Sequence, residues 1–541
     1  MKMNNLNKYF SILCALVLFG VTSCETTDLD INDNPNSLTQ ESADPNYVLN
    51  GLMFSTGIQN TTLSGLSSGV VRHINQFGTY ATSAGAGSMN GAWSNAYSLT
   101  SNLNLLKDMS AEQNLPVHVG IGQVLEALAY VNLVDYIGTA VYSEAVNPAF
   151  TQPNLDAGVD IYKSMLTQLD DAITNLNLTG SVTPEDIYFE DVSNWIKLAN
   201  TLKIKMYVQS RLAGDDWDGD GTSNKSSIEA IVADNKFISA NSDDFQIYFG
   251  SSETNPDNRH YGFTSDYITA VDTYMSNDFM NRMLVGNANT GKLVKDPRVP
   301  YYFYRQTLED PLTLDPGGDL LPCDGNAEYQ YCYLGGGYWG RDHADDEGIP
   351  NDGVYRTAWG IYPAGGAYDN GLGGSTLESI NLGGAGIQPI ILASYTHFWL
   401  AEAVLTMGVN ADAKALLKAG MELSLSKVAS FSGKAMDASE VTGYVDHVLA
   451  LYDAAATNEE KLAIVIEEFY IASFGNSVEA YNNYRRTGYP VLGNSVISNT
   501  DFPRSYFIPS SEMNSNDNPD LEQKKLTDQV FWDTNPAQFI D

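Results

Sequence analysis

Apolar residues recur at helical spacing in two separate blocks of the chain. Val124 and Leu128, for example, lie on one face of an expected helix over residues 122–137. The first block continues over residues 160–178 and 194–212, and the second covers residues 391–407, 412–428 and 459–484. Gly408 suits the end of one helix and Asp412 the beginning of the next. We therefore expect a mainly α fold, whose helix pairs could stack as tetratricopeptide-like hairpins without a clean repeat of about 34 residues.

The segment between the two blocks has a different composition. Residues 335–386 hold 15 of the chain's 46 glycines. Glycine at this density is typical of irregular loops, and loops on a helical scaffold often carry binding groups. We therefore predict a single domain over residues 47–541, with a loop-rich insert at about residues 300–390.

The first two dozen residues have the pattern of an export signal. Lys2 and Lys8 precede an apolar run over residues 9–21, which is too short to remain as a membrane-spanning helix. The run leads into Cys24, so the pattern resembles a bacterial lipoprotein signal. We predict that residues 1–23 are removed and that Cys24 carries several acyl chains such as palmitate, because a single chain binds a membrane only weakly. An ordinary secretory signal followed by a chance cysteine is the alternative.

Residues 24–46 have the composition of a tether. They contain six acidic residues and no basic residue, together with several Asn, Thr, Ser and Pro. Such a segment cannot bury enough apolar surface to fold, and twenty residues of it would reach roughly 25 Å. The folded body could therefore stand clear of the membrane surface.

The chain has a strong excess of acidic residues. It contains 66 Asp and Glu against 29 Lys and Arg, which gives a formal charge of −37. This charge repels phosphate backbones, so we do not expect nucleic acid as a partner. After the signal no segment approaches 18 uninterrupted apolar residues, so the lipid would be the only attachment to the membrane.

Two cysteines remain when Cys14 leaves with the signal and Cys24 carries lipid. These are Cys323 and Cys332, with eight residues between them. In an exported chain we predict that they form a disulfide. A zinc site is the alternative, but a second Cys or His pair with zinc-site spacing is missing nearby.

Several segments, in order, resemble one protein family. They are residues 135–145, 195–211, 296–298, 394–403, 477–492 and 502–512. This series is similar to that of the SusD/RagB-like outer-membrane lipoproteins. The GRDH sequence at residues 340–343 and the Tyr-Pro-Ala-Gly-Gly sequence at residues 362–366 resemble one SusD-like branch of that family.

The resemblance implies both a fold and a role. The fold would be SusD-like and mainly α, with tetratricopeptide-like helical hairpins and a loop-rich, glycine- and aromatic-rich ligand-binding region. The protein would lie on the outer membrane of a Gram-negative bacterium, facing the exterior. It would bind an oligosaccharide non-covalently and deliver it to a SusC-like TonB-dependent barrel transporter. Peptide capture by a RagB-like lipoprotein and a helical-repeat scaffold without a small ligand are the alternatives.

The sequence gives no sign of catalysis. Glycosidases need two carboxylates at a set separation, and nothing singles out such a pair among the acidic residues. The H-E-x-x-H and phosphate-loop patterns of metalloproteases and nucleotide-binding proteins are also missing. We therefore predict that the protein is not an enzyme and needs no cofactor apart from a possible structural calcium ion.

Aromatic residues in the glycine-rich segment are our candidates for ligand contact. They are Tyr338, Trp339, Trp359, Tyr362 and Tyr368. A flat ring offers a large contact area to the C–H face of a sugar, while nearby polar groups select its hydroxyl groups. The competing interpretation is that these rings bury themselves and hold the loops in place.

Asp216, Asp218 and Asp220, followed by Gly221, form the best metal pattern in the chain. Carboxylates at alternate positions can wrap a calcium ion, as in the first half of an EF-hand loop. Ser227 stands where an EF-hand has its bidentate glutamate. A weak calcium site and a solvated acidic turn both remain open.

Two further charged groups need an interpretation. Asp342 and His343, near Asp345 and Asp346, could suggest a metal, although a single histidine among aspartates is usually solvated. Arg485 and Arg486 follow an apolar helical run. Because arginine binds carboxylates with two parallel hydrogen bonds, we expect this pair to hold acidic helices together, with Glu402 and Glu479 as plausible partners.

Overall fold

The computed structural model describes residues 44–189, 191–309, 313, 321, 323–347, 352–376, 381–497 and 501–540. The predicted signal peptide, Cys24 and residues 24–43 of the predicted tether lie outside these residues. Residues from Pro45 onward belong to one unit with a shared core.

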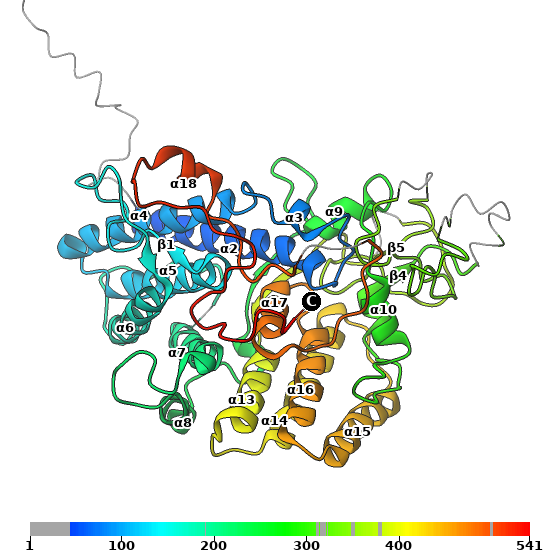
Figure 1. Cartoon of the computed structure of the whole chain (residues 1–541). Coiled ribbons are helices and arrows are strands. Elements are labelled where there is room, and N and C mark those ends of the chain that lie inside the picture. Colours follow the sequence, from blue (N-terminus) through cyan, green and yellow to red (C-terminus); the bar gives the residue numbers. More distant parts are fainter. Residues whose placement is uncertain are drawn as a thin grey trace, which may run out of the picture. The chain divides into compact units, whose positions relative to one another are not determined.

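Helices provide most of the regular structure, as the mainly α prediction requires (Figure 1). The first block consists of α2 (Pro45–Val70), α3 (Tyr80–Ser83), α4 (Asn90–Gln113), α5 (Pro116–Ile137), α6 (Gly158–Leu176), α7 (Ser193–Gln209) and α8 (Asn224–Asp234). The middle of the chain holds the shorter helices α9 (Tyr261–Tyr267), α10 (Asn277–Leu284) and α11 (Val299–Tyr302). The second block consists of α13 (Ala393–Met407), α14 (Ala413–Ser432), α15 (Ala438–Ala454), α16 (Asn458–Ala472) and α17 (Ser477–Thr487), and α18 (Ser510–Ser515) follows it. Two 3₁₀ turns are η2 (Ser210–Ala213) and η3 (Asn241–Asp243).

The strands are short and pair antiparallel in twos. The pairs are β1 (Thr139–Ala140) with β2 (Asp156–Ala157), β3 (Phe245–Tyr248) with β6 (Ile387–Ile391), and β4 (Phe303–Arg305) with β5 (Thr357–Trp359). In the second pair Phe245 lies opposite Ile391. Because β6 leads into α13, this pairing joins the end of the first block to the beginning of the second.

Helix α5 is the central helix of the first block, and every residue from Pro116 to Ile137 is buried. It packs against α4 and α6, and it ends at Gly138, whose φ of +86° lies in the left-handed region that glycine tolerates. Among the described helices, α5 alone is long and apolar enough to match a membrane span in length and composition. Burial on all sides explains this apolar composition, whereas the sequence predicted a helix with one broad apolar face.

The second block keeps its predicted caps but not its predicted last helix. Asp412 accepts hydrogen bonds from the backbone N–H groups of Lys414 and Ala415, and Gly408 ends α13 with a φ of +70°. The single helix predicted over residues 459–484 is wrong, because Gly475 adopts a φ of +94° and separates α16 from α17. Both helices are buried on most sides, so the apolar pattern continues across the break.

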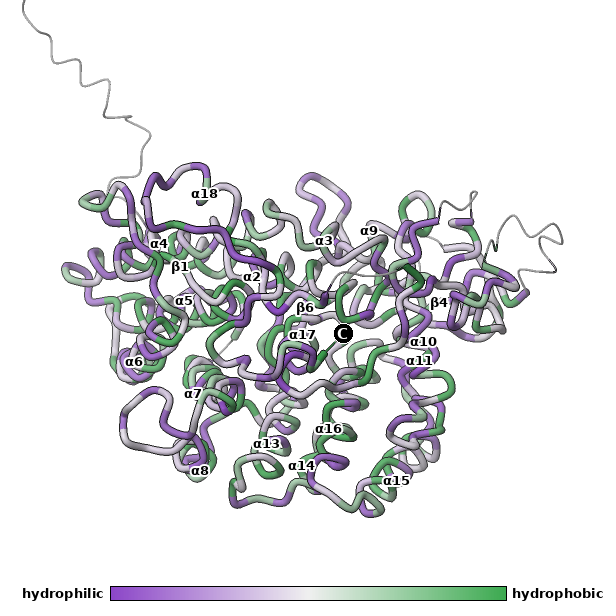
Figure 2. Tube along the Cα trace, viewed as in Figure 1, coloured by the Kyte–Doolittle hydropathy of each residue, from purple (hydrophilic) through white to green (hydrophobic). Residues whose placement is uncertain are grey.

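Packing between the two blocks gives the molecule a shared core. Helix α17 lies against α2, and α13 lies against α7 and α16. Figure 2 shows hydrophobic residues along α13 and α16, whereas α18 is hydrophilic and none of its residues is buried. Most of the helical surface is therefore used for packing, which leaves the loops and α18 to shape the accessible surface.

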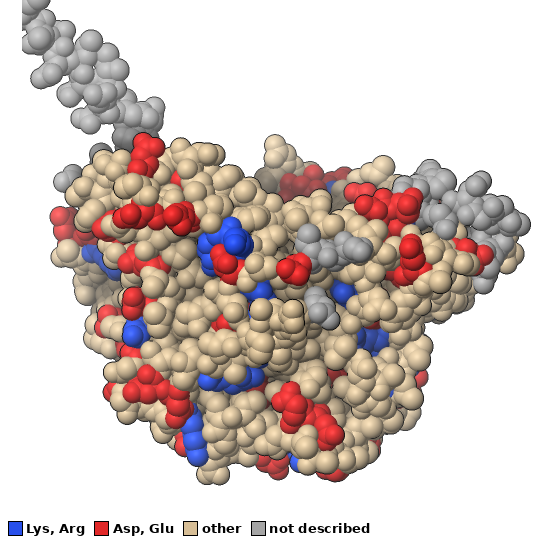
Figure 3. Space-filling model, in the orientation of Figure 1, with Lys and Arg blue, Asp and Glu red and all other residues tan. Residues whose placement is uncertain are grey.

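Several basic residues of this acidic chain lie in the interior. Arg298, Arg485 and Arg486 are among the largest fully buried side chains. Their charges are used in internal ion pairs and hydrogen bonds, so the surface is even poorer in positive charge than the sequence is. Figure 3 shows acidic side chains spread over the visible face, with few basic ones between them.

Candidate functional site

The predicted ligand rings lie mainly in the interior. Trp339 is 2% exposed and Trp359 is 5% exposed, Tyr338 and Tyr362 are buried, and Tyr368 is half-buried. A sugar cannot lie flat against a ring that other side chains already cover. This burial argues against ligand contact and favours the competing interpretation, in which the rings hold the glycine-rich segment.

Each of these rings packs against a side chain of the protein. Trp359 stacks on Phe474, with ring centroids 4.9 Å apart, and Trp339 stacks on Tyr355. Tyr362 stacks on Tyr302, and the guanidinium of Arg305 lies 4.6 Å from the ring centroid of Tyr338. Tyr368 meets Tyr301 edge to face. The ring of Trp359 thus attaches the insert to the helical body, and the other four rings hold parts of the insert together.

The predicted disulfide is present, and it lies against the GRDH segment. Cys323 and Cys332 are joined, with their Cα atoms 5.6 Å apart. The carboxylate of Asp342 accepts hydrogen bonds from the backbone N–H groups of Tyr331 and Cys332 and from the side-chain amide of Asn277. The Asp342 carboxylate is therefore used to fix the loop that carries the disulfide.

The remaining GRDH side chains also make internal contacts. Arg341 forms an ion pair with Asp345, and Tyr329 donates to the same carboxylate. His343 is buried, and burial lowers its pKa well below the ordinary value. These contacts favour a structural role for the segment over a metal site.

Arg486 and Glu402 form the ion pair that the sequence suggested. Nε and Nη2 of Arg486 lie 2.6 and 2.7 Å from the two carboxylate oxygens, and Arg211 donates to the same group. Burial alone would raise the pKa of the Glu402 carboxyl, but the two guanidinium groups hold it below its usual value. The prediction is wrong for Glu479, which pairs with Lys205.

Asp216, Asp218 and Asp220 come together as the sequence predicted. One carboxylate oxygen from each lies within 4.8 Å of the others. Burial, followed by the neighbouring Asp220 carboxylate, raises the pKa of Asp218. The oxygen ligands suit calcium, but exposed carboxylates of this kind also occur without a metal, so calcium binding stays a prediction.

Three cavities lie around residues 491–494. Two of them are lined by all four residues, and the third is lined by Val491 alone of the four. Their volumes are about 440, 370 and 750 Å³, and Val491 lines all three. We call them together the Val491 cleft. Polar side chains that line it include Asn281, Asn289, Gln330, Tyr331, Tyr489 and Asn494. This cleft is our candidate functional site.

Unused amide groups distinguish the first cavity. The side-chain amides of Asn281, Asn289 and Asn494 line it and make no hydrogen bond within the described residues. Each amide offers two N–H donors and a carbonyl acceptor, which matches the hydroxyl groups of a sugar. A polyhydroxylated ligand could therefore satisfy groups that the protein leaves open.

Apolar side chains lie at the mouth of the same cavity. Val285 is 58% exposed, Leu293 is 64% exposed and Val491 is 46% exposed. Such side chains can contact the C–H face of a sugar while the amides contact its hydroxyl groups. The cavity thus offers both kinds of contact that an amphipathic sugar ring needs.

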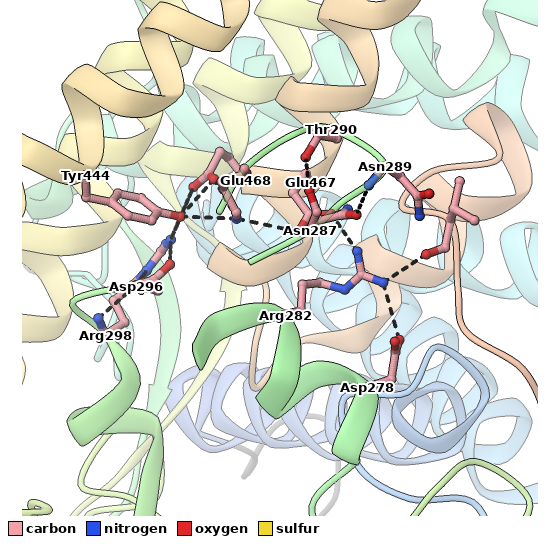
Figure 4. A network of polar contacts seen from close by, with 12 residues as sticks. Asp278, Arg282, Asn287, Asn289, Thr290, Asp296, Arg298, Tyr444, Glu467 and Glu468 are labelled. Carbon is pink, nitrogen blue, oxygen red and sulfur yellow. Dashed lines mark hydrogen bonds and ion pairs between the residues drawn. The ribbon is translucent and has the colours of Figure 1, made fainter. Parts of the chain in front are cut away.

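A buried network of charges forms the base of the cleft (Figure 4). Arg282 on α10 donates to Glu467 at 2.8 Å, to Asp278 at 3.3 Å and to the carbonyl oxygen of Val491 at 2.9 Å. Asn287 donates to the same Glu467 carboxylate at 2.7 Å. Since these groups come from α10, α16 and two loops, the network fixes the walls of the cleft relative to one another.

The network continues beneath the cleft into the second block. Lys292 lies 3.0 Å from Glu468. The Tyr444 hydroxyl donates to the same carboxylate (Figure 4). Burial alone would lower the pKa of Arg282, but Glu467 and Asp278 keep it above the ordinary value. Arg282 therefore remains charged, and its contacts position the cleft.

The cleft residues were not singled out from the sequence. Asparagine is common in surface turns, and Asn287 and Asn289 have no spacing that marks a binding site. The clustering of amides between residues 281 and 289 was the one local signal present. Their approach to Asn494 depends on the tertiary fold.

Two family models match the chain. The model described as "Starch-binding associating with outer membrane" matches residues 44–315, which is half of the chain. The model described as "Susd and RagB outer membrane lipoprotein" matches residues 386–517. No curated protein matches the chain.

Solved structures share the fold at low sequence identity. A SusD homologue from Bacteroides fragilis NCTC 9343 is 18% identical, with 88% of this chain and 93% of that chain covered and a TM-score of 0.63. A chitin-binding SusD homologue from Flavobacterium johnsoniae is 18% identical, with 91% and 99% covered and a TM-score of 0.64. A chitin-binding protein is 20% identical, with 91% and 100% covered and a TM-score of 0.62. At these identities the likeness establishes the fold.

Proposed function

The chain belongs to the SusD/RagB family of outer-membrane lipoproteins, and from this premise we propose that it binds an oligosaccharide non-covalently in the Val491 cleft. The observation that carries the proposal is the set of unused amides of Asn281, Asn289 and Asn494 beside exposed apolar side chains. Two similar structures are those of chitin-binding proteins, so an oligosaccharide of N-acetylglucosamine is the first ligand to test.

Binding without catalysis fits the charged groups of the first cavity. Its two charged side chains are Asp278 and Arg282, and the second cavity adds Glu460 and Glu467. Asp278 and Glu467 are both paired with Arg282, so both carboxylates serve as structural contacts at the base of the cleft. We therefore propose capture of the ligand and no chemical change to it.

The place of the protein in the cell is also part of the proposal. Acyl chains on Cys24 would hold the body at the outer membrane, facing the exterior. Residues 24–44 would serve as the tether, which is two residues shorter than the sequence predicted because Pro45 and Asn46 belong to α2 and are buried. The captured oligosaccharide would pass to a SusC-like TonB-dependent barrel transporter. Non-covalent binding suits such a transfer, because the ligand must leave the cleft unchanged.

Peptide capture is the second candidate. The second cavity is lined by apolar side chains that would suit an apolar peptide side chain: Leu451, Ala454, Ala463, Ile464 and Pro490. A peptide would use this cavity more than the amides of the first one. The two candidates therefore differ in which variants should weaken binding.

Isothermal titration calorimetry with an N-acetylglucosamine hexamer tests the proposal. We expect Asn289→Ala combined with Asn494→Ala to weaken binding about tenfold or more, because each lost hydrogen bond contributes roughly 1 kcal/mol. Asn410→Ala is the matched control, since Asn410 is exposed and lines none of the three cavities. Unchanged affinity in the double variant would reject the cleft, and binding of peptides alone would favour the second candidate.

A further inference from the structure

A second groove lies away from the Val491 cleft, between α4, the loop after β1 and α18. It consists of two cavities of about 480 and 430 Å³, which share Tyr97, Val146 and Glu512 among their lining residues. We call it the Tyr97 groove. No lining residue is common to it and to the Val491 cleft.

One wall of the Tyr97 groove carries hydroxyl groups. Ser94, Ser98 and Ser101 come from α4, and Ser511 and Ser515 come from α18. Their spacing of three or four residues places the serines of each helix on one face. The hydroxyls of Ser94 and Ser101 make no hydrogen bond within the described residues, so they remain available to a polar ligand.

The loop after β1 supplies an apolar wall. Val146 is 46% exposed and Phe150 is 44% exposed, and Pro148 and Pro153 lie beside them. An apolar wall opposite a row of hydroxyls suits a ligand that is itself amphipathic. A sugar ring, with its C–H faces and hydroxyl edges, has this character.

Tyr97 lies between the two cavities with an unused donor. Its hydroxyl oxygen accepts the backbone N–H of Val141 at 3.0 Å, but its proton is donated to no acceptor within the described residues. Burial raises the pKa of Tyr97 well above its usual value, so the hydroxyl keeps this proton. A ligand in the groove could accept it.

Two carboxylates line the groove without a basic partner. Glu144 accepts the backbone N–H of Asn154 at 2.8 Å, and Glu512 accepts the indole N–H of Trp93 at 3.3 Å and the amide of Asn516 at 2.8 Å. These neutral donors orient the carboxylates but leave their charges uncompensated. Among the described lining residues there is no Lys, Arg or His.

The surroundings strengthen this negative field. Figure 3 shows acidic side chains gathered over the part of the face where α4 and α18 lie. The formal charge of −37 on the whole chain adds to this negative field. A cation in a partly apolar groove gains more from a carboxylate than it would in water. A cationic ligand is therefore favoured.

We propose that the Tyr97 groove is a second ligand site, which binds an unacetylated 2-amino sugar unit of an oligosaccharide through its ammonium group. Glu512 and Glu144 would bind the ammonium, the serines and Tyr97 the hydroxyl groups, and Phe150 a C–H face. A lysine side chain would satisfy the carboxylates but leave the hydroxyls of Ser94 and Ser101 unused. This site is separate from the Val491 cleft, so a test of one site does not decide whether the other binds a ligand.

Calorimetry on the full-length protein in detergent tests the proposal with two hexamers of equal length. One contains glucosamine and the other N-acetylglucosamine, and both are titrated at pH 6, where the free amines are protonated. We expect the glucosamine hexamer to bind at the groove and Glu512→Gln to weaken this binding about tenfold, since it removes the charge but keeps the shape. Glu112 is an exposed carboxylate on α4 outside the groove, so Glu112→Gln should leave the affinity unchanged.

A second variant guards against a folding defect in the first. Ser98→Lys places an ammonium group in the groove from an exposed helix position, where lysine favours the helix more than serine does. We expect it to abolish binding of the glucosamine hexamer while Asn289→Ala in the Val491 cleft leaves that binding intact. The proposal is overturned if neither Glu512→Gln nor Ser98→Lys weakens binding of the glucosamine hexamer, or if these two variants weaken binding of the acetylated hexamer equally. It is also overturned if a lysine-rich peptide binds the groove more tightly than the glucosamine hexamer does.

Discussion

Arg282 donates a hydrogen bond to the carbonyl oxygen of Val491 at 2.9 Å, across 209 residues of sequence. The same guanidinium binds Glu467 and Asp278, and all three side chains are buried. Because Val491 lines all three cavities of the cleft, one buried cation links the shape of the candidate site to the stability of the fold.

Replacing Arg282 by Met should destabilise the protein strongly. Glu467 and Asp278 would remain buried without their shared cation, which typically costs about 3–5 kcal/mol. Denaturant unfolding followed by circular dichroism would measure this loss. Lys418→Met removes an exposed pair with Glu422 and should change the free energy of unfolding by less than about 1 kcal/mol. Equal effects of the two variants would show that the Arg282 network is not important for stability.

The free energy of unfolding should fall as the pH drops below 6.5. Burial lowers the pKa of both His73 and His260 from 6.5 to about 3, so between these values the unfolded chain binds protons that the folded chain refuses. Each histidine then contributes a slope of up to about 1.4 kcal/mol per pH unit. We expect His73→Gln to be less stable at pH 7 but less sensitive to acid. Parallel pH curves for the variant and the natural protein would contradict this.

The cysteines of the insert should be fully oxidised in protein exported from the cell. Mass spectrometry after alkylation without reduction should find no free thiol at Cys323 or Cys332. Loss of a bridge over so short a loop should cost roughly 2.5–3 kcal/mol in the loop-entropy model. Cys323→Ser together with Cys332→Ser should therefore lower the melting temperature. Two alkylated thiols in the natural protein would disprove the disulfide.

Calcium should bind weakly if the acidic turn is a metal site rather than a solvated turn. Extracellular sites of this kind have dissociation constants of about 10⁻⁴–10⁻³ M, which calorimetry can measure. Changing Asp218 and Asp220 to Ala should abolish the heat of binding, whereas changing the exposed Asp453 should not. Heat that persists in the double variant would place any calcium elsewhere.

Cys24 should decide whether the protein stays with the membrane. We expect metabolic labelling with palmitate to mark the natural protein and the bulk of it to sediment with outer membranes. Cys24→Ser should lose the label and release the protein from that fraction, because the apolar signal segment alone is too short to remain as an anchor. A labelled or membrane-bound Cys24→Ser protein would contradict the predicted lipidation.

Helices and their caps were predicted correctly from short-range sequence patterns. The helices around residues 122–137 and 391–428 were predicted from spacing, and the caps at Gly408 and Asp412 are confirmed. A side chain that caps a helix acts on the next two or three residues, so its effect can be recognised locally. The break at Gly475 was missed because two buried helices in succession leave a continuous apolar pattern.

The aromatic residues illustrate the opposite case. The sequence places Trp339 and Trp359 in a glycine-rich segment, which is compatible with exposed binding rings and with buried anchors. Only the fold brings Phe474 against Trp359 and Tyr355 against Trp339, and so covers both rings. No local pattern distinguishes the two outcomes, since the decisive neighbour of Trp359 is more than a hundred residues away in the chain.

The helical class of the protein and its family could be predicted before the fold was known, because periodicity, capping and ordered motifs depend on residues that are close together in the chain. The tertiary structure alone decided which polar groups are used inside and which remain open to a ligand. Arg486 contacts Glu402, and Arg282 contacts Val491, while the side-chain amides of Asn289 and Asn494 make no hydrogen bond to any residue that the structure describes. The physical reason is that burial and hydrogen bonding depend on which distant segments come into contact, and a linear sequence does not specify those contacts residue by residue.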